Sequence, residues 1–204
     1  MGKLTGSFHD FLRSRRSVRR FKPEAVDAKL LTRILETATY APSAHNHQPW
    51  RFAALTGPEP KSRLAQALAA EYRRDLTAEG MPAAEIEARA SRSQSQVLDA
   101  PVVVVLCMDA SEMRIHASEK LRQVERILET QSAALAGLQL QLAVHAEGLG
   151  SVWMCRPVFA PEAVRKVLGL PETWEPQAMF FIGYPDEQPK PKVLKPLDET
   201  VIFM

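Results

Sequence analysis

The sequence predicts a single α+β domain over residues 1–204, in which helices cover the faces of one sheet. Three observations carry this prediction. A chain of 204 residues is long enough to bury one core and short enough not to need a second. The β-branched run at 102–108 follows Ala-Pro, as a strand buried on both faces would. Helical and strand patterns alternate along the rest of the chain, which favours a sheet with helices packed on it.

The other elements follow from local signals, namely capping residues, prolines at helix starts, and short β-branched or aromatic runs. In order, the sequence predicts a helix from Asp27 that ends before Pro42, a strand at 50–55, helices at 61–74 and 82–98, a strand at 152–154, a helix from Pro161 to Gly169, and a strand at 179–183. Because the helix at 82–98 is rich in Glu, Arg, Ser and Gln, we expect a peripheral helical excursion at about 72–98.

The longest helical pattern, at 124–147, is apolar on nearly every side. Its apolar side chains occupy two faces, with Leu128, Leu135, Leu138 and Leu142 on one and Ala136, Leu140 and Val144 on the other. A helix of this kind must be buried all round. In a chain of this size, we expect a partner subunit to supply the missing cover.

Composition excludes several classes of function. The formal net charge of +2 is too small to indicate general nucleic-acid binding. The longest apolar runs are too short to span a bilayer, and the first residues have no apolar core of signal-peptide length, so we expect no membrane partner and a cytoplasmic location. Only two cysteines occur, and we expect Cys107 and Cys155 to be buried free thiols rather than a disulfide.

Two basic clusters indicate an anion site. RRSVRRF at 15–21 and KPKVLK at 190–195 lie near opposite ends of the chain and could grip one anion from two sides. Guanidinium groups beside a serine hydroxyl suit phosphate oxygens. The alternative is a solvated basic turn. The chain contains neither the phosphate-loop nor the dinucleotide-binding glycine pattern, which disfavours those two kinds of site.

The stretch APSAHNHQPWRF at 41–52 predicts a polar loop that ends in a tryptophan. Its amide side chains offer donors and acceptors to the edge of a flat heterocycle. His45 and His47 have no carboxylate or cysteine at ligand spacing, so the sequence predicts no metal site. Ser43 and His45 lack the glycine-flanked serine elbow of a hydrolase. GLGS at 148–151 predicts either a close backbone approach to a ligand or a plain helix cap and turn.

Together these motifs resemble the nitroreductase family of FMN-dependent flavoproteins. The resemblance covers nearly the whole chain through five ordered motifs, RRSVRRF, APSAHNHQPWRF, the long helix into GLGSVW, LGLPETWEP, and IGYPDEQPKPKVLKPLDE. It implies a nitroreductase-like α+β fold with a mixed sheet flanked by helices, an intertwined homodimer, and FMN in a groove at the subunit interface. It also implies an oxidoreductase that takes hydride from NADH or NADPH and passes it through flavin N5 to a small acceptor. No side chain needs to act as a nucleophile.

The resemblance also assigns site residues position by position. Arg15, Arg16, Ser17 and Arg19 match the segment that grips the flavin phosphate and polar tail. Pro42, Ser43, Ala44 and Asn46, with Gln48 nearby, match the loop beside the isoalloxazine ring, contributed across the dimer. Leu149 and Gly150 match the segment whose backbone approaches the ring, and Lys192 matches a basic tail position at the phosphate. Leu194 stands where many members carry Arg, and Lys195 is the substitute we expect.

A narrower resemblance concerns the acceptor. The stretch from EYRRDL to APVVVV, residues 71–105, is similar to the reductase domain fused to glutamate ligases that build the 8-hydroxy-5-deazaflavin coenzyme. By that resemblance Asp75 lies near the flavin, and the acceptor is a dehydro precursor of the coenzyme. The alternatives are a general nitro or quinone reductase, a flavin or deazaflavin carrier without turnover, and a basic interaction module without a small ligand. His45 is a candidate proton donor, since imidazole titrates in the right range.

Overall fold

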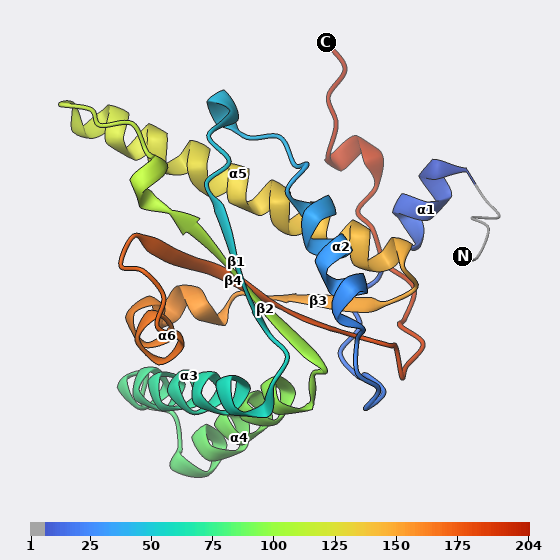
Figure 1. Cartoon of the computed structure of the whole chain (residues 1–204), viewed down its shortest axis with the longest axis vertical. Coiled ribbons are helices and arrows are strands. Elements are labelled where there is room, and N and C mark those ends of the chain that lie inside the picture. The colour runs from blue at the N-terminus through green and yellow to red at the C-terminus, as the bar shows by residue number, and fades with distance from the viewer. Residues whose placement is uncertain (1–6) are drawn as a thin grey trace.

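The computed structural model describes residues 7–204 and shows ten regular elements (Figure 1). The helices are α1 (Phe8–Ser14), α2 (Ala28–Ala38), α3 (Pro58–Ala78), α4 (Ala83–Asp99), α5 (Glu119–Ala146) and α6 (Pro161–Leu168). The strands are β1 (Trp50–Leu55), β2 (Val102–Asp109), β3 (Gly150–Met154) and β4 (Trp174–Gly183). The predicted α+β class is confirmed, and β1 has the predicted bounds.

The four strands form one sheet in the order β1-β2-β4-β3, and every pair of neighbouring strands is antiparallel. Within residues 7–204, the parallel component of the expected mixed sheet is a single bridge between Ser17 and Ser151. The central strand β2 is buried along its whole length, which confirms the prediction made from its β-branched run. A bulge between Leu106 and Cys107 shifts its register against β4.

The side chains of β2 alternate between two cores, because successive residues of a strand point to opposite faces. Val104 and Leu106 belong to the core under α2 and α5. Val103 and Val105 belong to the core under α3, α4 and α6. Figure 1 shows the sheet between these two groups of helices, with α4 lying outside α3.

Helix α5 packs on the sheet through small residues. A Cβ added at Gly137 would lie only 2.4 Å from Trp153 Cζ3, so glycine is what lets the helix approach this ring. Trp153 in turn meets Phe180 edge to face, with ring centroids 5.0 Å apart. This contact fixes α5 against β3 and β4.

The outward face of α5 is not covered by the described chain. Leu135 and Leu138 on this face are 43% and 46% exposed, and Val124 and Ile127 are also exposed. The inner face, which includes Ala136, is buried as predicted. Burial on all sides therefore does not occur within one chain.

Two other predictions are corrected. Helix α5 begins at Glu119 rather than near 124. Leu121 is the one apolar residue among residues 119–123, so the apolar pattern does not mark this start. Cys155 is exposed, not buried, and its sulfur accepts a hydrogen bond from the Trp153 indole at 3.2 Å. Cys107 is buried as predicted, and burial raises the pKa of its thiol to about 12. Among residues 7–204, no helix is both long and apolar enough to cross a bilayer.

Candidate functional site

The arginine segment at 15–20 is held along the edge of β3. The Val18 amide donates to the Ser151 carbonyl at 3.0 Å, and the Lys22 amide donates to the Tyr184 carbonyl at 2.9 Å. A Cβ at Gly150 would lie 2.8 Å from Val18 Cβ. Gly150 is thus required by the close approach of this segment.

A basic hollow opens beside this segment, lined by Arg15, Arg16, Ser17, Arg19, Arg20, Glu187, Gln188, Pro189, Lys190 and Lys192. The structure therefore brings Lys192 of the tail to the arginine segment, some 170 residues earlier in the sequence. Leu149 and Gly150 line an adjoining hollow that also contains Arg15 and Arg16. Lys195 is exposed and lines neither hollow.

Among the described residues, Arg15 is the one in the basic hollow that has an unsatisfied buried donor. Its Nη1 atom is buried and has no hydrogen-bond partner among residues 7–204. Burial, helped by the neighbouring charge of Arg16, lowers the pKa of Arg15. Because a guanidinium stays protonated in proteins, this group is a desolvated cation without a counterion. A phosphate in the hollow would supply the missing acceptor, so the residues present fit a phosphate-bearing cofactor.

Glu187, which the sequence analysis missed, fastens the tail to the arginine segment. Its carboxylate accepts the backbone amides of Arg19 at 2.5 Å and Arg20 at 3.1 Å, and lies 3.4 Å from Arg20 Nε. The hydrogen bond from the Arg19 amide is the main cause that lowers the pKa of Glu187. No local signal marks this role, since the partners are far apart in sequence.

Ser14 and His145 form a second pair that the sequence analysis missed, in the hollow beside Leu149. Ser14 Oγ and His145 Nε2 are 2.7 Å apart. Burial, together with the charge of Arg15, lowers the pKa of His145, which favours the neutral imidazole. The pair adds a polar, uncharged wall to the cationic hollow.

The loop of Pro42, Ser43, Ala44, Asn46 and Gln48 lies against the middle of α5. Pro42, Asn46 and Gln48 are exposed, and the Gln48 amide donates to Ser43 Oγ at 3.0 Å. Gln48 and Asn46 have left-handed backbones, with φ values of 51° and 56°. The Ala44 amide donates to Ser132 Oγ at 3.1 Å, which anchors the loop to the helix.

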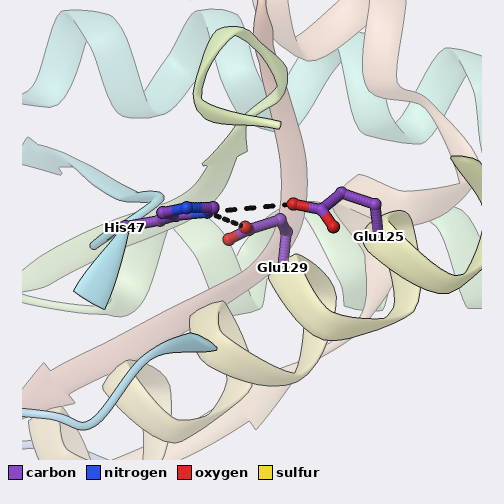
Figure 2. Close-up of side chains that lie close together, drawn as sticks. All are labelled: His47, Glu125 and Glu129. Atoms are coloured by element: carbon purple, nitrogen blue, oxygen red, sulfur yellow. Dashed lines mark hydrogen bonds and ion pairs between the residues drawn. The ribbon is translucent and has the colours of Figure 1, made fainter. Parts of the chain in front are cut away.

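His47, in the same loop, meets two carboxylates of α5 (Figure 2). Its Nδ1 atom is 2.6 Å from Glu129 Oε1 and 3.9 Å from Glu125 Oε1. The sequence has no carboxylate at ligand spacing to His47, but the fold brings two from about 80 residues away. Their spacing of four residues on a helix was the available signal.

The expected site residues form three separate groups in one chain. Ser132 beside the loop and Ala146 beside the hollows are about 21 Å apart along α5 at 1.5 Å per residue. Asp75 lies in a third place, a hollow on α3 lined also by Tyr72, Arg156 and Phe159. The Arg156 guanidinium sits 5.0 Å above the Tyr72 ring. One chain alone does not bring the loop and the basic hollow together.

Comparison with known proteins identifies the family. Residues 12–184 match the Nitroreductase family over most of the chain. The chain belongs to the nitroreductase family. An NADH dehydrogenase of Thermus thermophilus is similar, with 31% identity over 93% of this chain and 92% of that protein.

Solved structures of nitroreductase-family proteins share this fold. A Bacillus cereus protein described as nitroreductase-like has a TM-score of 0.77 at 23% identity and covers 100% of this chain and 99% of that one. A Desulfovibrio desulfuricans nitroreductase solved in complex with FMN has a TM-score of 0.75 at 25% identity, over 98% of each chain. The family and the nitroreductase-like fold expected from the motifs are thus confirmed.

Glu187→Gln tests whether the Glu187 carboxylate holds the C-terminal tail against the arginine segment. Because the folded pKa of Glu187 is depressed, its ionised form stabilises the fold above the ordinary carboxyl pKa, and this contribution is lost as pH falls through the folded pKa. We expect Glu187→Gln to lower the free energy of unfolding at pH 7 by on the order of 1 kcal/mol. The difference in the free energy of unfolding between Glu187→Gln and the unmodified protein should become smaller below about pH 4.

Urea unfolding at both pH values, at one protein concentration, measures this effect. Glu24→Gln, at an exposed carboxylate, is the matched control and should change stability little at either pH. Two results would contradict the assigned role of Glu187. One is an equal loss of unfolding free energy in both variants, and the other is a loss in Glu187→Gln that does not depend on pH.

Proposed function

We propose that this chain is an FMN-dependent oxidoreductase that uses NADH or NADPH as electron donor. The observation that carries the proposal is the buried, unpartnered Nη1 of Arg15 in a hollow that also contains Arg16, Arg19 and Lys192. The FMN complex of the Desulfovibrio relative and the name of the Thermus relative support the same cofactor and donor.

Different residues of this chain would contact different parts of such a cofactor. Arg15, Arg16 and Arg19 supply charge-assisted donors to a phosphate, Ser17 adds a hydroxyl, and Lys192 adds a cation from the tail. When bound, FMN supplies the hydride chemistry, and the protein supplies placement and electrostatics. Leu149 and Gly150 form the apolar wall that leads from the phosphate end towards the flavin ring.

We further propose an intertwined homodimer that completes the site. The loop at 42–48 and the basic hollow lie too far apart in one chain to contact one flavin, so a second copy supplies the loop. The apolar outward face of α5 offers the surface for this pairing. The C-terminal tail also exposes Leu194, Leu197, Ile202 and Phe203, which a partner would cover.

The acceptor that we propose is a flat conjugated molecule, with a dehydro precursor of a deazaflavin coenzyme as first choice. The hollow around Asp75 offers aromatic rings in Tyr72 and Phe159, which suit a planar ligand. Its charged lining is Arg156 with Glu71, Asp75 and Glu79, so such a ligand would place any anionic group at Arg156. Arg156 Nη1 is buried and lacks a partner among the described residues, so it too would gain from an anionic acceptor. A nitro or quinone reductase is the alternative, and a cofactor carrier without turnover is a further one.

Cofactor retention is the first test. We expect the purified protein to show a flavin spectrum that bleaches anaerobically with NADH or NADPH and recovers when an acceptor is added. Arg15→Ala should weaken FMN binding by about 10- to 150-fold, because a hydrogen bond to a charged group is worth about 1.5–3 kcal/mol. Arg63→Ala, at an exposed arginine of α3, is the control. A colourless protein, or unchanged affinity in Arg15→Ala, would refute this assignment.

Competition between acceptors tests the finer proposal. We expect kcat/KM for the dehydro deazaflavin precursor to exceed that for nitroaromatics by about tenfold or more, which is about 1.4 kcal/mol in the barrier. The reverse ranking favours the nitro or quinone reductase. A flavin that neither nicotinamide reduces favours the carrier, so the three alternatives give different results.

The dimer is tested by placing a charge on the outward face of α5. Leu138→Glu should yield a monomer that loses FMN. Burying one leucine contributes about 1.5–3 kcal/mol, and a two-fold symmetric interface buries this leucine from both copies. Light scattering coupled to gel filtration gives the mass. Leu98→Glu, at a leucine of α4 that is 42% exposed, is the matched control and should leave the mass unchanged. A dimeric Leu138→Glu protein that retains FMN would contradict the proposed interface.

A further inference from the structure

His47, Glu125 and Glu129 form a cluster outside the basic hollow and the Asp75 hollow. One ligand atom from each lies within 4.8 Å of the other two. Figure 2 shows the His47 ring on one side, facing both carboxylates, which project from successive turns of α5. Imidazole nitrogen and carboxylate oxygen are the donor types that zinc and its neighbours in the first transition series take from proteins.

The charge of this cluster is not balanced by the side chains drawn in Figure 2. The Glu129 side chain is fully buried, and the Glu125 side chain is 5% exposed. Two ionised carboxylates place two negative charges in this buried cluster, and His116 and Arg114 are basic residues close to Glu125. Buried charges are normally paired or bound to metal ions. A divalent cation would neutralise both carboxylates at once.

Glu129 also has an unused ligand atom. Its Oε1 atom contacts His47, but the buried Oε2 atom has no hydrogen-bond partner among residues 7–204. Buried polar atoms in proteins are rarely left without a partner, and a bound ion can satisfy them as a hydrogen-bond donor does. This observation is independent of the clustering, and it shows that the pocket still lacks a donor or a cation.

The surroundings hold the Glu125 carboxylate in place. The Arg114 amide donates to Glu125 Oε1 at 3.2 Å, and His116 Nε2 lies 3.5 Å from Glu125 Oε2. Metal-binding carboxylates are commonly hydrogen-bonded in this way by groups that do not touch the metal. His116 lies outside the set of mutually close ligand atoms, so it acts as one of these outer partners of Glu125.

We propose that His47, Glu125 and Glu129 bind one divalent cation of the zinc class, with a fourth position open to water. Bond lengths of 2.0–2.2 Å in a tetrahedral site place ligand atoms about 3.4 Å apart. To reach this spacing, the 2.6 Å contact between His47 and Glu129 must open, and the wider separations, 3.9 Å from His47 to Glu125 and at most 4.8 Å within the cluster, must close. Magnesium and calcium are disfavoured, because they prefer all-oxygen ligand sets.

The bound cation would brace the loop at 42–48 against α5. His47 lies between Asn46 and Gln48, so a metal bond at its Nδ1 atom restrains the segment more firmly than a hydrogen bond does. The competing arrangement is an ion pair between protonated His47 and the carboxylates, without any metal. The two arrangements differ in metal content, and that difference does not depend on FMN binding or turnover.

Metal analysis of the tag-free protein tests the site. After treatment with EDTA, dialysis against ZnCl2 and removal of loose metal, we expect one zinc per chain by elemental analysis. X-ray absorption at the zinc edge should show nitrogen and oxygen ligands and no sulfur. Glu129→Gln and Glu125→Gln keep the side-chain shape and remove a ligand charge. Each should lose more affinity than the roughly 10–100-fold typical of an outer hydrogen-bonding partner.

His9→Ala, which removes an exposed histidine of α1, is the matched control and should keep one zinc per chain. Circular dichroism of each variant establishes that it is folded, and the two glutamate variants serve as checks on each other. Two results would overturn the proposal. One is unmodified protein that retains no zinc, which supports the ion pair, and the other is zinc that stays bound in both folded glutamate variants.

Discussion

The structure depends on one helix that is apolar on two faces. The inner face of α5 builds the core under the sheet, and Gly137 allows it to pack directly on Trp153. Because α5 also carries the contacts of the 42–48 loop and leads into β3, its position sets the places of that loop and of Leu149 and Gly150. The leucines left on its outer face need a surface that one chain does not provide, and each buried leucine is worth about 1.5–3 kcal/mol.

The same helix explains why the proposed cofactor site is divided. Ser132 holds the loop at the middle of α5, while Gly148 ends the helix with a left-handed φ of 74° and directs the chain into the hollow side of β3. A rigid helix cannot bring its middle and its end together. In the proposed dimer, a ligand that contacts both groups would lie across two copies of the chain, so covering the apolar face and completing the site would be one event.

Local patterns predicted the parts of the fold that local physics determines. Asp27 caps α2 as expected and accepts the amides of Lys29 and Leu30, and the β-branched run of β2 is buried throughout. The family motifs also led to Arg15 and Lys192, which the fold gathers in one hollow. Glu187 could not be found in this way, because its role comes from backbone amides about 170 residues away that only the tertiary fold brings near.

Cys155 and the carboxylates beside His47 also show that the sequence alone does not tell which side chains the tertiary fold buries. An apolar neighbour such as Met154 suggested burial for Cys155, yet the strand ends there and its side chain faces outward. No motif in the sequence singled out Glu125 and Glu129, yet the fold buries both and places His47 of the loop against them. Arg15 Nη1, in the hollow beyond the end of α5, and Glu129 Oε2, on the helix itself, are thus two buried atoms without a hydrogen-bond partner among residues 7–204. Burial without a partner is costly, so both places are best explained by ligands of opposite charge.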